Sequence, residues 1–167
     1  SRLVDRAIRP LFPENFFEQV QILATVYSTD KINSPYALSL VAASLALTIS
    51  KIPFLGPVGA IEICRIDGEW KISPNWDEAK KADAKVLVAG TMEGVCMLEG
   101  AMDNIPDDEL LDAIFKAHEA VKLQIKWQEE VRDAVGQKKE NVEDTFDWSM
   151  WEDRATKFLS EDKIRTA

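Results

Sequence analysis

The sequence has little of what metal and disulfide chemistry requires, with one histidine and two cysteines in 167 residues. A zinc site usually takes four nitrogen or sulfur ligands, so His118, Cys64 and Cys96 are too few to form one. Two cysteines also make no disulfide framework, and we expect both to be small buried thiols in a reducing compartment. We expect His118 to lie in the core or on a helix surface. A Gly-rich phosphate loop and a nucleophile elbow are missing too, which excludes those common catalytic classes.

Long apolar runs are also missing. A bilayer span takes roughly 18 residues, whereas the longest apolar stretch here, YALSLVAASLALTI, has about 14 and contains Ser and Thr. It therefore predicts a buried core helix and no membrane partner. The sequence has no signal peptide and no initial Met, and it begins within a predicted helix. We expect it to be a piece of a longer cytoplasmic protein.

Positive charge is in deficit, because 20 Lys and Arg stand against 29 Asp and Glu and the formal net charge is −9. Arg2, Arg6 and Arg9 nevertheless lie close together at the start. Their i, i+4, i+7 spacing places all three on one face of a helix. One interpretation is structural, with pairing to Asp5 and other nearby carboxylates. The other is a phosphate-binding face, because guanidinium groups match phosphate oxygens in a bidentate manner. The spacing alone leaves both open.

The first third of the chain has clear helix and strand patterns. Residues 3–9 have a helical pattern that two prolines end. Apolar residues alternate over 19–28, which predicts a strand. Ser34 suits a helix N-cap and Pro35 the first helical position. We therefore expect a helix over 35–50, apolar nearly all round and buried against a sheet.

The rest of the chain predicts a sheet followed by a long helix and then a change of composition. From Gln137 the sequence becomes polar, as in a linker, and then helical again. We expect an α/β (α+β) fold with an antiparallel or mixed sheet, packed helices and a final all-helical segment. The expected elements are a Pro/Gly connector at 52–59, a hairpin over 60–73 that turns at Asp67-Gly68, strands at 84–90 and 94–100, and an amphipathic helix at about 107–135.

Several motifs in order resemble the first RNase PH-like core of the polynucleotide phosphorylase family. They are SRLVDRAIRPLFPENFFEQVQILATVYSTD, NSPYALSLVAASLALTISKIPFLGPVGA, IDGEWKISPN and VLVAGT. The similarity covers about residues 1–136, and residues 137–167 match more loosely the start of the family's all-helical linker. The resemblance implies that 1–136 is the C-terminal part of the first core. The family's earlier strands and RNA-clamping loop have no counterpart in this sequence.

The resemblance also implies an activity for the parent protein. Inorganic phosphate attacks the 3′-terminal phosphodiester of RNA and releases nucleoside diphosphates, and the reverse reaction adds nucleotides. The family enzyme is a homotrimeric ring that uses Mg²⁺ in its second core. Two alternatives remain: a non-catalytic RNA-binding or ring-scaffold subunit of an exosome-like assembly, and a stand-alone RNase PH-type enzyme.

The sequence departs from the family's catalytic pattern, so the resemblance implies no catalytic or metal residue in this chain. The second-core motif is G-D-M-D-F-K-V-A-G, and the aligned stretch here is ADAKVLVAG. Asp83 matches the first Asp, Lys85 replaces the second and Leu87 replaces the Lys. An ammonium group only donates hydrogen bonds, so Lys85 cannot be a metal ligand. In the family's Ser-rich phosphate turn, only Ser34 is retained.

What the resemblance assigns to the first core is RNA-binding arginine. Arg2 and Arg6 match family residues that reach toward RNA and phosphate near the second core's active site. For Arg9 the resemblance leaves two roles open, RNA contact or structural pairing. Ala7 stands where proline is common in the family, and we expect it to make the helix more regular.

Overall fold

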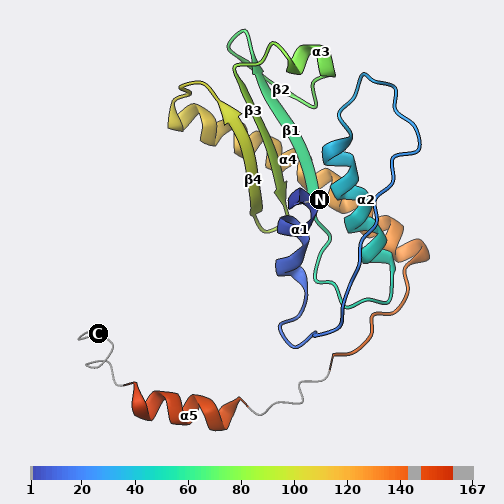
Figure 1. The fold of residues 1–167 in the computed structure, drawn as a ribbon, viewed down its shortest axis with the longest axis vertical. Coiled ribbons are helices and arrows are strands. Elements are labelled where there is room, and N and C mark those ends of the chain that lie inside the picture. The colour runs from blue at the N-terminus through green and yellow to red at the C-terminus, as the bar shows by residue number, and fades with distance from the viewer. Residues whose placement is uncertain (1, 143–147, 160–167) are drawn as a thin grey trace.

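A four-stranded antiparallel sheet in the order β2-β1-β3-β4 forms the centre of the fold (Figure 1). The computed structural model describes residues 2–142 and 148–159. The predicted hairpin is confirmed, and its turn residues Asp67 and Gly68 have φ of 52° and 81°, as a two-residue hairpin turn requires. The strands are β1 (Gly59–Ile66), β2 (Glu69–Ile72), β3 (Ala84–Gly90) and β4 (Val95–Met102).

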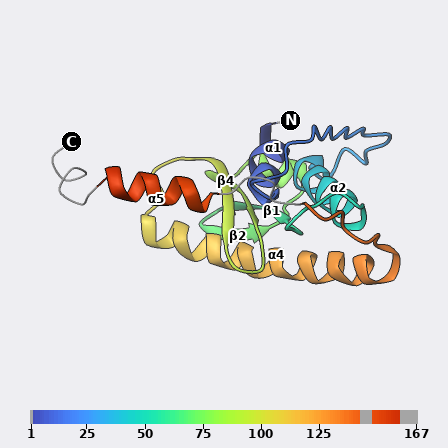
Figure 2. The same cartoon turned by 90° about the horizontal axis from the view of Figure 1, so that it is seen from below.

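Helices cover both faces of the sheet (Figure 2). The long helix α4 (Asp107–Val135) covers one face, and α1 (Arg2–Ile8) and α2 (Pro35–Ile49) pack on the other. Successive strand residues point to opposite faces, so each strand contributes to both cores. The observed α4 and the antiparallel sheet with helices on both faces confirm the predicted long helix and α/β fold. On the α4 side the buried strand residues are Ile61, Ile63, Val86 and Val88, and on the α1 and α2 side they are Ala60, Leu87, Ala89 and Met97.

Polar side chains from two helices hold the connector that leads into β1. Ser44 of α2 accepts a hydrogen bond from the Val58 backbone N–H at 2.8 Å. Gln128 of α4, which is fully buried, donates to the Val58 carbonyl at 2.9 Å, and Gln124 accepts from Ala60 N–H at 2.8 Å. Since buried backbone groups need partners, these contacts let a Pro/Gly segment cross the core.

The helix α2 begins as predicted, but it is buried on one side only. The Ser34 side chain accepts a hydrogen bond from the backbone N–H of Tyr36, and Pro35 is the first helical residue. Tyr36 and Leu38 are 50% and 68% exposed. The prediction of burial nearly all round was therefore wrong, because no packed element of the described chain covers this second face.

The predicted strand over 19–28 was also wrong. This segment runs past α2 without forming a strand, and its residues from 21 to 28 are exposed. Alternating apolar and polar side chains give a strand one apolar face. A strand also needs a neighbouring strand whose backbone N–H and C=O groups pair with its own. None of the backbone hydrogen bonds found within the described residues joins 19–28 to another strand.

This segment gives a first testable expectation. Backbone amides of residues 20–28 should exchange with deuterium much faster than those of β1 and β3, because exposed amides without hydrogen bonds have little protection. Hydrogen-exchange mass spectrometry or NMR measures this directly. Protection of 20–28 comparable to β3 would contradict the structure.

Residues after α4 return to the end of α2. The backbone N–H groups of Gln137 and Glu140 donate to the carbonyls of Ile49 and Lys51, both at 2.8 Å. The Lys139 ammonium donates to the carbonyls of Leu47 and Ser50 at 2.7 and 2.9 Å, and burial lowers the pKa of this group. A cation beside the last carbonyls of a helix also interacts favourably with the negative end of the helix dipole.

Two short helices complete the described chain. Helix α3 (Trp76–Ala79) begins with a capping box in which Asn75 and Glu78 exchange hydrogen bonds. Helix α5 (Ser149–Phe158) agrees with the predicted helical segment, and its large apolar side chains Trp151 and Phe158 are exposed. None of the described helices combines the length and apolar character that crossing a membrane requires.

Candidate nucleic-acid interface

Helix α1 carries the arginines and is fixed to the core by its opposite side. Ala7 and Ile8 are 0% and 2% exposed, and they pack with residues of α2 and the sheet. The helix continues regularly through Ala7, as expected from a residue without the restrictions of proline. Arg2 and Arg6 lie on α1, and Arg9 begins the short 3₁₀ turn Arg9–Leu11.

Arg6 reaches the neighbouring strand. Its Nη1 donates to Glu99 Oε2 of β4 at 3.1 Å, and both side chains are 50% exposed. Exposed ion pairs contribute only about 0–1 kcal/mol, because water screens them and two long side chains must be ordered. A phosphate group can therefore compete with Glu99 for this guanidinium.

Arg9 is more firmly engaged than Arg6. Its Nε and Nη2 both donate to Asp5 Oδ1, at 3.1 and 2.6 Å. It also borders a surface hollow of about 470 Å³ whose walls include Asp5, Glu14 and Glu18. Carboxylates repel phosphate, so the surroundings of Arg9 favour the structural interpretation for this residue.

Arg2 differs from both. It is exposed, and it forms no ion pair with any residue in the described part of the chain. Its guanidinium is thus free to bind an anion. The arginine face consists of Arg2, available, and Arg6, weakly paired, with Arg9 tied to Asp5 at its far end.

Asp83, aligned with a catalytic position, has a structural role here. Arg65 Nη1 donates to Asp83 Oδ2 and Arg65 Nε donates to Glu109 Oε1, both at 2.6 Å. The same Glu109 oxygen accepts from the Trp70 indole N–H at 3.0 Å. These contacts join β1 and β2 to the start of α4, and the carboxylates raise the pKa of Arg65.

Lys85, at the second catalytic position, is paired with a buried carboxylate. Its Nζ lies 3.2 Å from Glu62 Oε1 and 5.7 Å from the centre of the Trp76 ring. The Glu62 side chain is only 7% exposed, and no hydrogen bond from the described part of the chain reaches its Oε1, so the contact with Lys85 is ionic. Leu87 is 5% exposed and apolar.

These residues do not fit Mg²⁺. A hard divalent cation takes several oxygen ligands, whereas positions 83, 85 and 87 offer one carboxylate already bound by Arg65, one ammonium and one leucine. Within residues 2–142 and 148–159, no group of three or more His, Cys, Asp or Glu could hold a metal ion. The stretch that the resemblance aligned with the catalytic motif is here part of the packed sheet.

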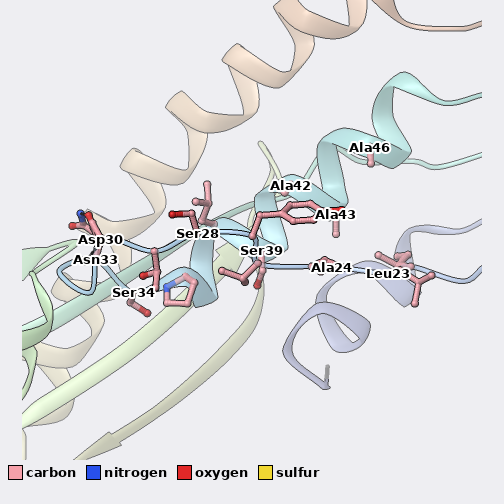
Figure 3. Close-up of a pocket in the computed structure, with 17 residues that line it drawn as sticks. Leu23, Ala24, Ser28, Asp30, Asn33, Ser34, Ser39, Ala42, Ala43 and Ala46 are labelled. Carbon is pink, nitrogen blue, oxygen red and sulfur yellow. Dashed lines mark hydrogen bonds between the residues drawn. The ribbon is translucent and has the colours of Figure 1, made fainter.

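The retained serine of the phosphate turn faces an acidic neighbour. Ser34 lies with Asp30 and Asn33 at one end of a groove between residues 22–30 and the exposed side of α2 (Figure 3). Hydrogen bonds from Asn33 and from the Ile32 backbone N–H lower the pKa of Asp30, so this carboxylate is ionised at neutral pH. Its charge opposes phosphate binding, and the Ser34 hydroxyl serves as a helix cap.

The remaining reactive side chains are mostly structural. His118 is 7% exposed, and its Nε2 forms a 2.9 Å hydrogen bond with the Thr91 carbonyl, which confirms its core position. Cys64 is buried, and burial followed by the nearby Glu62 charge raises its thiol pKa to about 11. Cys96 is exposed, so the prediction of two buried thiols was wrong for it. Its strand, β4, lies at the edge of the sheet, where no second strand of the described residues pairs with it.

The sequence did not identify Glu99 and Glu62 as partners of the two cations. Both glutamates stand in predicted strands, and the strand period indicates which face each occupies. The partner depends on the pairing of Glu62 with Leu87 and of Leu87 with Glu99, which is set by register. A register prediction for the sheet would have placed Glu62 beside Lys85, whereas the pairing of Arg6 with Glu99 also depends on how α1 packs on the sheet.

Comparison with known proteins places these features in a family context. Residues 1–53 match the 3′ exoribonuclease family, domain 1, and residues 56–120 match the same family's domain 2. The polyribonucleotide nucleotidyltransferase of Persephonella marina is 43% identical over 143 residues, which are 86% of this chain and 20% of the relative. That of Bacteroides fragilis (strain ATCC 25285) is 44% identical over 135 residues, or 81% of this chain and 19% of the relative.

A further relative, from Geotalea uraniireducens, carries the same name and is 44% identical over 141 residues, which are 84% of this chain and 20% of the relative. The chain thus spans about a fifth of the length of these curated relatives. Among solved structures, rice Rrp46 is similar in fold, with a TM-score of 0.55, 14% identity, and coverage of 61% of this chain and 49% of that one. At this identity the likeness concerns the fold alone.

Proposed function

Since the chain belongs to the 3′ exoribonuclease family of RNase PH domains, we propose that it is part of an enzyme that degrades RNA by phosphorolysis from the 3′ end. In this reaction inorganic phosphate takes the place of water and the products are nucleoside diphosphates. The names of the curated relatives, nucleotidyltransferases that act on polyribonucleotides, support this proposal. The parent protein we propose is a cytoplasmic homotrimer whose Mg²⁺ is bound by another part of the polypeptide.

Within that enzyme, this chain supplies a surface that guides RNA and a scaffold for the ring, while the catalytic centre lies elsewhere. The observation that carries the proposal is that Arg2 and Arg6 lie one turn apart on α1, one unpaired within the described residues and one in a weak exposed pair. Residues 1–136 form the C-terminal part of the first, non-catalytic core. Residues 137–167 form the linker and the start of the helical domain.

A non-catalytic scaffold subunit of an exosome-like assembly is the second candidate. The Lys85–Glu62 pair supports this candidate as much as the first, because an ion pair occupies the position that the resemblance aligns with a metal ligand. The two candidates differ in what the rest of the native protein contains. A second core that carries two aspartates and the catalytic lysine supports the enzyme.

The test is RNA binding by a double variant, Arg2→Ala with Arg6→Ala. Each phosphate contact on single-stranded RNA contributes about 0.7 to the slope of log affinity against log salt concentration, because bound counterions are released. Loss of two contacts should weaken binding several-fold at low salt and reduce that slope by roughly 1.4. Fluorescence anisotropy with labelled poly(A) at several salt concentrations measures both quantities.

A matched control removes two positive charges from the opposite face of the sheet. Lys122→Ala with Lys126→Ala on α4 changes the net charge equally, and it should leave the salt slope nearly unchanged. An equal fall in slope for both double variants would show that only net charge matters. An unchanged slope in the arginine variant would assign Arg2 and Arg6 a structural role.

A further inference from the structure

The two edges of the sheet are protected to very different degrees. At one edge, β2 has only four residues, and charged Glu69 and Lys71 alternate with the other two. Short edge strands with charged side chains resist pairing with another chain. At the other edge, β4 has eight residues, VCMLEGAM, with a single charged side chain and no proline or lysine.

That single charge is already balanced. Glu99 accepts a hydrogen bond from Arg6 of the same chain, so it offers little repulsion to an approaching strand. Leu98 and Met102 are each 42% exposed, and they point to the face opposite Met97 and Glu99. Among the described residues, β4 pairs with β3 alone, which leaves its outer backbone groups open (Figure 1).

The long helix extends this apolar surface. On one flank of α4, His118 contacts Thr91 in the β3–β4 turn, whereas on the other flank Lys116 contacts the Trp70 carbonyl in β2. Helical spacing puts residues three and seven positions before His118 on its flank. These are Phe115 and Leu111, which are 64% and 53% exposed. Leu98 and Met102 of β4 and Leu111 and Phe115 of α4 therefore all lie on the β4 side of the sheet.

We propose that β4 is an interaction surface that pairs antiparallel with β4 of a second copy of this chain. If the twofold axis passes at Gly100, Leu98 of each copy lies opposite Met102 of the other, so apolar side chains meet across strands. Glu99 then lies opposite Ala101, which keeps the two carboxylates apart and each beside its own Arg6. No like charges face each other directly in this register.

The glycine at the proposed axis is required by the sheet of its own chain. Gly100 already packs so closely that a Cβ added to it would lie 2.5 Å from the Lys85 carbonyl of β3. The contact joins two four-stranded sheets into one continuous antiparallel sheet. It is twofold, and it depends neither on RNA nor on the ring proposed above.

The experiment is the oligomeric state of the 167-residue chain by size-exclusion chromatography with light scattering. The wild-type chain should show twice the mass of one chain at high concentration. Leu98→Lys with Met102→Lys should give a monomer, because lysines on an edge strand oppose pairing. As matched control, Leu123→Lys with Val135→Lys changes two comparably exposed apolar residues of α4, 67% and 65% exposed, and should leave the dimer intact.

Hydrogen exchange of the wild-type chain supplies a test that does not depend on any variant folding. Amide protection in β4 should rise with protein concentration, while protection in β2 stays constant. A chain that is monomeric at every concentration would overturn the proposal. So would a dimer that survives the Leu98 and Met102 substitutions, or β4 protection that is independent of concentration.

Discussion

Replacing Lys85 with methionine is expected to lower the free energy of unfolding by about 3 kcal/mol. The substitution keeps an apolar stem of similar length but leaves the Glu62 carboxylate, 7% exposed, without its cation. A buried charge without a partner is costly, since the protein interior solvates it poorly. The estimate is at the low end for a broken buried pair because Lys85 itself is 40% exposed. Urea denaturation followed by circular dichroism measures the change.

A second substitution in the same pair separates charge from packing. Glu62→Gln combined with Lys85→Met removes both charges, and most of the lost stability should return because no lone ion remains. An exposed pair such as Lys80–Asp77 provides the matched control, and Lys80→Met should change stability by less than about 0.5 kcal/mol. If Lys85→Met leaves the free energy of unfolding unchanged, Lys85 does not stabilise the buried Glu62 carboxylate and this account of the pair is wrong.

Most of the secondary structure was predictable because its signals are local. The Asp67-Gly68 hairpin, the Ser34 cap and the start of the long helix each depend on a few adjacent residues. Such signals act through the backbone conformation that each residue type favours. The resemblance to a known family then supplied the arrangement of these elements.

What failed depended on partners distant in sequence. The segment 19–28 has the alternation of a strand, but no strand of the described residues lies beside it. The exposed side of α2 has the same origin, since an apolar helix surface does not specify what covers it. The partner of Lys85 depends on strand register, which a one-residue shift would have changed completely. The partner of Arg6 depends on how α1 packs against β4.

The largest functional effect expected of this chain is the absence of catalysis. Phosphoryl transfer needs charge stabilisation at the attacked phosphate, and the proposed enzyme takes it from Mg²⁺ bound by another part of the polypeptide. Here Asp83 is bound by Arg65, and Lys85 stands where a second carboxylate would be required. The ammonium group of Lys85 repels a divalent cation, so this chain should release no nucleoside diphosphate even when Mg²⁺ is added.

One measurement tests the account most directly: the 167-residue chain is incubated with labelled poly(A), inorganic phosphate and Mg²⁺, and bound RNA and released nucleoside diphosphate are followed in the same sample. A polyribonucleotide nucleotidyltransferase relative serves as the positive control. The account predicts RNA binding that weakens with salt and with the Arg2→Ala, Arg6→Ala variant, and no nucleoside diphosphate above background. Robust release of nucleoside diphosphate, or no RNA binding even at low salt, would contradict it.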